Sequence, residues 1–365
     1  MADKLISVCF TIYKAYPIFN PDVKAVFGGG EVDLYLLATE LAKDKRFKVS
    51  FVLGDYGQPE TEIIEGVTLY KSLNVNKSYF LQAHKIWNAL KKSDADIYMN
   101  EVCSMSTVLH AFFCRLKRRH FVYRTAHTDE TDGTYFRENK FRGLFVKWAF
   151  RQAEQLITQN DQDVTDLQST FGLSSVVIRN ACVILSHINK EKNTVLWVAR
   201  NAAFKRPDLF LEMAKSCPDQ KFVMICPASS QGDYETLVKK AESIANLEFH
   251  CRCSFDKIDE YFQQAGVFVS TSDSEGFPNT FVQACKAATP IISLNVNPDG
   301  FLDKYGCGVC CNGDLEEMKQ QIKNFIGTQE GLEMGMNARN YAEQNHDLRK
   351  ITEQYKEIFI RLGQK

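Results

Sequence analysis

Residues 274–283 carry the clearest chemical signal in the chain, because they place an acid, a glycine and a proline between an apolar strand at 266–271 and a helical run. The start of a helix offers unpaired backbone N–H groups and the positive end of the helix dipole, which suits a phosphate. Pro278 fits the first turn because it has no N–H to leave unpaired. Glu275 would stand beside the anion and accept hydrogen bonds from sugar hydroxyls. The segment therefore indicates a ligand in which a sugar is attached to a phosphate.

A second group of polar residues follows the predicted strand at 195–198. Arg200 ends this strand, and Lys205 and Arg206 lie in the loop before the next helix. Cations at the carboxyl end of a parallel strand face the crevice where ligands of such sheets bind. Arg200 can bind two phosphate oxygens at once and Lys205 can add a mobile point charge, whereas the alternative is a solvated basic loop. We expect one sheet to bring this loop and Glu275 to the same rim.

A run of three glycines follows the first predicted strand and precedes the helical run at 32–41. Gly28, Gly29 and Gly30 permit positive φ and a close approach of the backbone, so an anion could lie against the helix N-terminus. The run lacks both the Gly-x-Gly-x-x-Gly spacing of a dinucleotide site and the Gly-Lys-Ser/Thr ending of an NTPase loop. A plain strand-to-helix turn is the alternative.

The elements that must position these residues alternate along the chain, since short apolar runs are separated by longer segments with helical spacing. This alternation is typical of a parallel sheet covered by helices. The predicted strands of the first half are 5–12, 48–53, 96–102, 121–126 and 155–159, and one such unit finishes near 176–180. Those of the second half are 195–198, 222–225, 247–250, 267–270 and 291–294, followed by helices at 315–326, 332–344 and 349–362. The polar stretch 186–193 between the halves predicts a domain boundary.

Length and charge limit the classes of function. A chain of 365 residues is longer than a single hydrophobic core usually supports, so its length predicts two domains. Its net charge of -1 gives no overall attraction to nucleic acid or to a membrane. No segment is apolar over the roughly 18 residues that a membrane-spanning helix needs, so any contact with a membrane would be at its surface.

The twelve cysteines are interpreted as reduced and mostly buried thiols. The chain opens with Met-Ala-Asp-Lys and lacks the apolar core of a secretory signal, so we expect a cytoplasmic protein without an oxidised framework. A zinc site is the alternative for Cys251, Cys253, Cys307, Cys310 and Cys311. Only Cys307 and Cys310 have the spacing of a zinc knuckle, so small apolar residues at strand ends are the favoured interpretation.

Taken together, these motifs resemble the retaining glycosyltransferases of family 4. The resemblance extends from the glycine run through 157–160 and 179–180 to 195–207 and 274–279. That family has the GT-B fold, an α/β architecture in which two Rossmann-like, doubly wound parallel-sheet domains face each other across a cleft and a C-terminal helix crosses back. The resemblance implies an acceptor-side domain over 1–185, a nucleotide-sugar-binding domain over 186–345 and a helix over 346–365 that packs on the first domain.

The resemblance also implies roles for individual residues. Arg200 and Lys205 would hold the diphosphate of the donor, and Glu275 would contact the transferred sugar. Gly29 and Gly30 would lie against the phosphates. His127, after an inner strand of the first domain, would face the sugar, although composition alone makes it an ordinary loop residue. The further donor-binding residues are Gly276, Phe277, Pro278, Asn279 and Gln283.

Gln283 departs from the family pattern, which has a second acid at this position that binds the ribose hydroxyls. Glutamine keeps an acceptor and adds donors, so ribose binding could survive through a weaker, neutral hydrogen bond. Three family glycines are replaced by the small residues Ala199, Cys226 and Ala288. A sugar-nucleotide binder that has lost turnover is therefore an alternative, and so is a nucleotide-sugar epimerase of the same fold.

The expected reaction moves a sugar from a nucleotide-diphosphate sugar to a saccharide or lipid-linked saccharide, in surface polysaccharide or glycoconjugate assembly. Uridine diphosphate is favoured on family frequency only. We expect no cofactor or metal, because Arg200, Lys205 and helix N-termini can stabilise the departing diphosphate. Two tripeptides match the Asp-x-Asp pattern of a metal-binding motif, namely Asp161-Gln162-Asp163 and Asp94-Ala95-Asp96. We interpret the first as helix-capping residues and the second as turn residues. The resemblance implies retention of configuration, and front-face attack by the acceptor is our hypothesis.

A basic segment raises the question of a membrane contact. Residues 111–153 contain ten Lys or Arg and four Asp or Glu, with Phe141, Leu144, Phe145 and Trp148 at helical spacing. A basic amphipathic helix can lie on an anionic bilayer, which would suit a lipid-linked acceptor and a peripheral position at the inner membrane face. An apolar stripe in such a fold usually packs on its own sheet, so core packing is the favoured interpretation.

Overall fold

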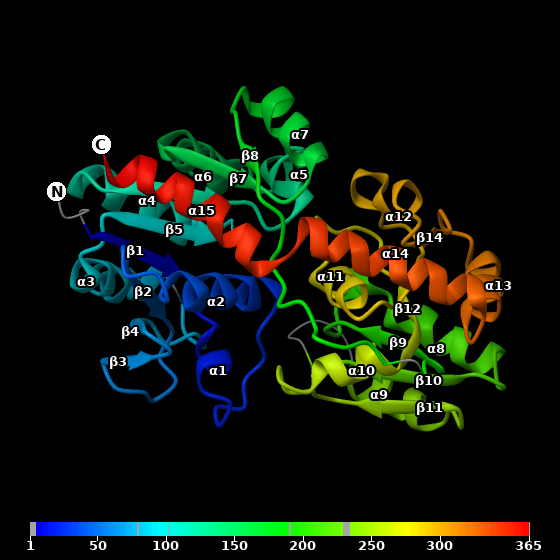
Figure 1. Cartoon of the computed structure of the whole chain (residues 1–365). Helices are drawn as coiled ribbons and strands as arrows, with labels where there is room; N and C mark the ends of the chain where they lie inside the picture. Colours follow the sequence, from blue (N-terminus) through cyan, green and yellow to red (C-terminus); the bar gives the residue numbers. More distant parts are fainter. Residues whose placement is uncertain (1–4, 79, 102, 190, 229–233, 365) are drawn as a thin grey trace. The chain divides into compact units, whose positions relative to one another are not determined.

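The computed structural model describes residues 5–364 apart from 79, 102, 190 and 229–233 (Figure 1). The chain forms two compact units. The first comprises Met1–Ala181 and Leu348–Lys365, and the second comprises Cys182–Asp347. Each unit contains one sheet with helices on both faces, as alternating buried strands and amphipathic helices require.

The sheet of the first unit has eight strands in the order β3-β4-β2-β1-β5-β6-β7-β8. All neighbouring strands are parallel except β3 and β4, which form an antiparallel edge. The strands are β1 (Ile6–Thr11), β2 (Phe47–Leu53), β3 (Thr61–Ile64), β4 (Val67–Lys71), β5 (Ile97–Glu101), β6 (His120–Arg124), β7 (Gln155–Thr158) and β8 (Val176–Val177).

Helices cover both faces of this first sheet. On one face lie α3 (Ala83–Ser93), α4 (Met105–Lys117), α6 (Lys140–Gln152) and α7 (Asp161–Phe171). On the other face α2 (Gly29–Leu41) packs beside α15 (Leu348–Gly363), the red helix of Figure 1. The rings of Phe10 on β1 and Phe359 on α15 meet at 6.3 Å, so the last helix is part of the core of the first unit. The shorter helices are α1 (Tyr16–Phe19) and α5 (Thr134–Glu138).

The second unit has a six-stranded parallel sheet in the order β11-β10-β9-β12-β13-β14. Its strands are β9 (Thr194–Val198), β10 (Lys221–Ile225), β11 (Leu247–His250), β12 (Ala265–Ser270), β13 (Ile291–Ser293) and β14 (Gly308–Cys310). One face is covered by α8 (Pro207–Ser216), α9 (Tyr234–Glu242) and α13 (Leu315–Phe325). The other is covered by α10 (Ile258–Gln264), α11 (Asn279–Lys286), α12 (Phe301–Lys304) and α14 (Gln329–Asn345).

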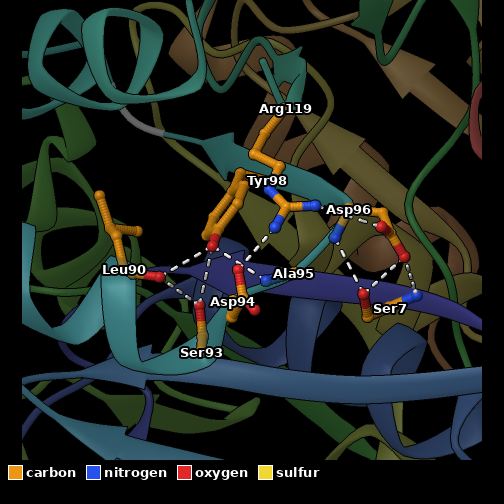
Figure 2. Close-up of polar contacts among 8 residues, drawn as sticks. All are labelled: Ser7, Leu90, Ser93, Asp94, Ala95, Asp96, Tyr98 and Arg119. Atoms are coloured by element: carbon orange, nitrogen blue, oxygen red, sulfur yellow. Dashed lines mark hydrogen bonds and ion pairs between the residues drawn. The ribbon is translucent and has the colours of Figure 1, made fainter. Parts of the chain in front are cut away.

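Hydrogen bonds at the amino ends of β1 and β5 fix the register of the first sheet, as Figure 2 shows. The Asp96 carboxylate accepts from the backbone and the hydroxyl of Ser7, at 3.0 and 2.6 Å. Arg119 pairs with Asp94 at 2.6 Å and with Asp96 at 3.4 Å. Tyr98 donates its hydroxyl to the Leu90 carbonyl at 2.8 Å. Both acids of the Asp94-Ala95-Asp96 tripeptide thus bind other parts of the chain at this edge.

A buried ion cluster lies at the carboxyl ends of β5 and β6. The Arg124 guanidinium, at the end of β6, contacts Glu101 of β5 at 2.8 Å and Asp33 of α2 at 2.6 Å, and donates to Asn180 at 2.5 Å. The Asp33 carboxylate also accepts from the backbone N–H of Ala181 at 2.6 Å. The cluster therefore ties two strands, one helix and the end of the first segment together through charge-assisted hydrogen bonds.

The structure corrects the interpretation of the apolar stripe on α6. Phe141, Leu144 and Phe145 have exposed fractions of 75%, 69% and 42%, so they do not pack in the core as expected. Trp148 is half-buried against the core, and the buried face of α6 instead presents Val146, Ala149 and Phe150. The core side of α6 thus lies opposite Phe141 and Leu144.

Three strands escaped prediction. The β3–β4 pair is a short hairpin at the edge of the sheet, and β14 has three residues. Cys307 precedes β14 and Cys310 ends it, and all twelve cysteines are free thiols.

Within the described residues, no helix combines the length and apolar character needed to cross a membrane.

Replacing Arg124 with Met should destabilise the first unit, because Asp33 and Glu101 would stay buried without their cation. We expect the free energy of unfolding to fall by about 3 kcal/mol or more, measured by urea unfolding followed by circular dichroism. Arg252→Met, at an exposed position of the second unit, is the control and should change this free energy by less than about 0.5 kcal/mol. Equal stability of Arg124→Met and the unmodified chain would contradict the role assigned to the cluster.

Candidate functional site

The candidate site of the second unit begins with two neighbouring parallel strands. Strand β9 pairs with β12, so Val198 and Ser270 end at the same edge of the sheet. The loops that follow, 199–206 and 271–278, leave this edge side by side. The carboxyl edge of a parallel sheet is where ligands bind in folds of this type.

Hydrogen bonds hold the two loops against each other. Trp197 Nε1 donates to Thr271 Oγ1 at 2.9 Å, and this hydroxyl donates to the Lys205 carbonyl at 2.7 Å. The backbone N–H of Asp273 donates to the Phe204 carbonyl at 2.8 Å. Since Trp197 and Thr271 are buried, these bonds fix the loop that carries Lys205 to the end of β12.

The structure brings Lys205 and Glu275 into direct contact, although they lie 70 residues apart. The Lys205 ammonium pairs with Glu275 Oε1, and the Ser272 hydroxyl donates to the same oxygen at 3.1 Å. The side chains of Lys205 and Glu275 are only 18% and 9% exposed. The ammonium also lies 5.1 Å from the centre of the Phe204 ring. A cation that can bind phosphate and an acid that can bind hydroxyl groups therefore share one point on the rim.

The electrostatic setting of Lys205 makes its charge sensitive to pH. Burial and then the nearby charge of Arg200 lower the pKa of Lys205 to about 7. The Glu275 carboxylate opposes this shift, because an adjacent anion favours the charged amine. Arg200 itself is exposed in the loop, two residues after β9 ends. An anionic ligand would add negative charge beside both cations and so favour the protonated form of Lys205.

Helix α11 begins next to this pair. The helix starts at Asn279, and Pro278 occupies the N-cap position with φ −63° and ψ 127°, one residue earlier than predicted. Gly276 is buried, and Phe277 packs its ring 5.1 Å from that of Phe301, so a ligand would meet the backbone of Phe277 rather than its ring. Gln283 lies one turn after Asn279 and is half-buried.

The glycine run begins α2 in the first unit. Gly28 is the N-cap residue, and its N–H donates to the Glu31 carboxylate at 2.8 Å. A Cβ added to Gly30 would lie only 2.8 Å from Glu101 Oε1, so this position requires the close approach that only glycine allows. Gly29 is exposed at the first helical position. The ion cluster thus lies directly beneath the start of this helix.

His127 is exposed and precedes the short 3-10 helix Thr128–Glu130. It lies three residues after Arg124, on the segment that leaves the carboxyl end of β6. Strands β1, β5 and β6 are neighbours, so the glycine run and His127 follow the same edge of the first sheet. Its role at a sugar remains a prediction.

Several residues that build these sites were not singled out from the sequence. Glu101 and Arg124 end buried strands, and a charge at such a position is a signal for a buried ion pair. Thr271 and Ser272 lie four and three residues before Glu275, and both form hydrogen bonds to residues of the site. The residues around Thr271 in the sequence do not indicate that its hydroxyl accepts a hydrogen bond from the indole N–H of Trp197.

The acids of the second metal-like tripeptide have partners in the first unit. Asp161 pairs with Arg179 at 3.0 Å, and Asp163 accepts from Thr131 at 2.9 Å. Helix α7 begins at Asp161, and its N-cap is Asn160, whose side chain accepts from the Asp163 N–H at 2.7 Å. In the part of the chain that the structure describes, no three His, Cys, Asp or Glu residues gather as metal ligands.

The chain is similar to known glycosyltransferases. Residues 186–345 match the family model described as glycosyl transferases group 1. An uncharacterized glycosyltransferase of Haemophilus influenzae is 22% identical over 356 residues, which cover 91% of this chain and 96% of the relative.

Solved structures show the same architecture. Sucrose-phosphate synthase from Thermosynechococcus elongatus has a TM-score of 0.78 at 15% identity, covering 98% of this chain and 99% of its own. HepE from Anabaena, solved with UDP and glucose, has a TM-score of 0.75 at 17% identity, covering 97% and 99%. These likenesses confirm the predicted GT-B fold with two Rossmann-like, parallel-sheet units.

The family match covers the whole of the rim that carries Lys205 and Glu275, and the fold match covers nearly the entire chain. Residues 186–345 therefore match the glycosyl transferases group 1 family model, on a chain that has the GT-B fold.

Proposed function

We propose that this protein is a retaining glycosyltransferase of family 4 that takes its sugar from a nucleotide-diphosphate donor. The contact between Lys205 and Glu275 carries the proposal. It joins a phosphate-binding cation and a sugar-binding acid on one rim, within a domain of a glycosyltransferase family. The ligand that uses both groups is a sugar linked to a diphosphate.

The chemistry requires stabilisation of the departing diphosphate. Lys205 and Arg200 supply positive charge where negative charge develops on the leaving phosphate, and the N-terminus of α11 adds backbone N–H groups. Glu275 accepts hydrogen bonds from sugar hydroxyls and so orients the anomeric carbon. We propose that transfer needs no metal and proceeds with retention, by attack of the acceptor on the face that the diphosphate leaves.

For the nucleotide we propose uridine diphosphate. HepE, which shares the fold, was solved with UDP and glucose, and this supports the choice. Gln283 lies one turn into α11, where it can offer an amide to the ribose hydroxyls. We propose a saccharide or a lipid-linked saccharide as the acceptor, with His127 and the glycine run of the first unit contributing to the reaction.

The first prediction concerns the phosphate site. Lys205→Ala should weaken UDP binding by about tenfold to a hundredfold, because a charge-assisted hydrogen bond contributes about 1.5–3 kcal/mol. Isothermal titration calorimetry measures the affinity. Lys215→Ala removes an exposed lysine from α8 and should leave the affinity unchanged. Equal affinities of the two variants would remove Lys205 from the phosphate site.

The second prediction separates sugar binding from nucleotide binding. Glu275→Gln should lower kcat/KM for sugar transfer by about a hundredfold, because the neutral amide loses the charge-assisted bonds to sugar hydroxyls. UDP affinity should not fall, since the variant also releases Lys205 from its carboxylate partner. A nucleotide-sugar panel with radiolabelled donor measures transfer. Isomerised donor without acceptor would instead identify an epimerase, and binding of donor with no turnover by the unmodified chain would identify a binding protein.

The third prediction follows from the lowered pKa of Lys205, about 7. The amine is charged below this pH and increasingly neutral above it, so UDP affinity should fall as the pH rises through about 7, and binding above this pH should take up protons. Lys205→Arg keeps its charge and should lose this dependence. Calorimetry in buffers of different ionisation enthalpy measures the proton uptake. The same pH dependence in both proteins would show that another group titrates.

A further inference from the structure

Two neighbouring helices of the first unit expose an unusual set of apolar side chains. Of the fifteen large apolar residues exposed in the described chain, six lie on α4 and α6, including all three exposed phenylalanines. They are Met105, Phe112, Leu116, Phe141, Leu144 and Phe145. We call this surface the α4–α6 face. Apolar side chains gathered on one surface mark an interaction site, whereas scattered single ones do not.

Helical spacing places these residues on the outer sides of their helices. On α6, Phe141 and Leu144 are three residues apart and lie opposite the buried Val146 and Phe150. On α4, Phe112 and Leu116 are four residues apart and lie opposite the buried Thr107 and Cys114.

The two outer sides form one continuous surface. Helices α4 and α6 pack against each other on the same face of the sheet. Arg115 of α4 donates to Gln152 of α6 at 2.8 Å, which joins their outer surfaces. The rings of Phe141 and Phe145 meet at 5.3 Å. Both helices therefore present their exposed side chains away from the sheet, in one layer.

The charged side chains of α4 and α6 are all positive. Neither α4 nor α6 contains an Asp or a Glu. Six exposed cations lie on these helices or directly after α4, namely Arg115, Lys117, Arg118, Lys140, Arg142 and Arg151. Lys140 lies one turn before Leu144 and Arg151 lies two turns after it, on the same side of α6. The net charge of the whole chain is only -1, so this positive charge is local.

We infer that the α4–α6 face binds the surface of an anionic lipid bilayer. Two helices that lie flat in one layer can press Phe and Leu side chains into the boundary between headgroups and acyl chains. The flanking Lys and Arg side chains can reach outward to lipid phosphates, as in interfacial amphipathic helices. The complete absence of acids from both helices matches the negative sign of such a membrane. None of these residues belongs to the proposed transfer machinery, so the inference is independent of the proposed function.

Sedimentation of the full chain with vesicles tests this inference. The chain should bind vesicles that contain phosphatidylglycerol, should bind phosphatidylcholine vesicles more weakly, and should lose binding as salt is raised. Phe141→Ser/Leu144→Ser should reduce partitioning by at least about tenfold. Lys140→Gln/Arg142→Gln/Arg151→Gln should reduce it by about a hundredfold. All of these side chains are exposed, so both variants should keep the melting temperature of the unmodified chain.

Leu332→Ser/Met336→Ser is the matched control, because it removes two exposed apolar residues from α14 of the second unit and should leave vesicle binding unchanged. The inference is overturned if the unmodified chain does not bind anionic vesicles, or if both α4–α6 variants bind as well as the control. Sedimentation velocity without lipid tests the alternative that a second copy of the chain binds this face. A self-association that the Phe141→Ser/Leu144→Ser variant abolishes, with no vesicle binding, would show that the face binds a second copy of the chain.

Discussion

The parallel pairing of β9 with β12 is the constraint on which the site of the second unit depends. It makes two loops leave one sheet edge together, although Lys205 and Glu275 are 70 residues apart. The buried Thr271 hydroxyl then links them, since it accepts from the Trp197 indole and donates to the Lys205 carbonyl. The position of the ammonium beside the carboxylate is thus determined by backbone pairing and by buried hydrogen bonds, rather than by the ion pair alone.

The same principle operates with different groups in the first unit. There the carboxyl ends of β5 and β6 place Glu101 beside Arg124, and Asp33 of α2 completes the buried cluster. Burial raises the pKa of Glu101 to about 7, although Arg124 acts in the opposite direction. Because Gly30 lies against the Glu101 carboxylate, the start of α2 is held close to the sheet edge. Two carboxylates, Glu31 and Glu101, therefore stand near the N–H groups of this helix terminus and compete there with any added anion.

How far the sequence predicts the molecule depends on the periodicity of each segment. The inner parallel strands are continuous apolar runs, so β9 and β12 and the loops after them could be located, and with them Lys205 and Glu275. The β3–β4 hairpin is short and none of the β3 residues is buried, which weakens that signal. Periodicity identified an apolar stripe on α6 but not the side of the helix that faces the sheet, and Phe141 proved to be exposed. The partners of Arg124 come from distant segments of the chain, so no local sequence pattern predicts them.

We propose that Lys205 and Glu275 hold the two ends of one ligand, the phosphate and the sugar. A crystal structure of the full chain with a non-hydrolysable UDP-sugar is the decisive test. We expect a phosphate oxygen within hydrogen-bond distance of Lys205 Nζ, and a sugar hydroxyl that donates to the Glu275 carboxylate. A diphosphate bound elsewhere, with Lys205 still paired to Glu275 alone, would contradict it.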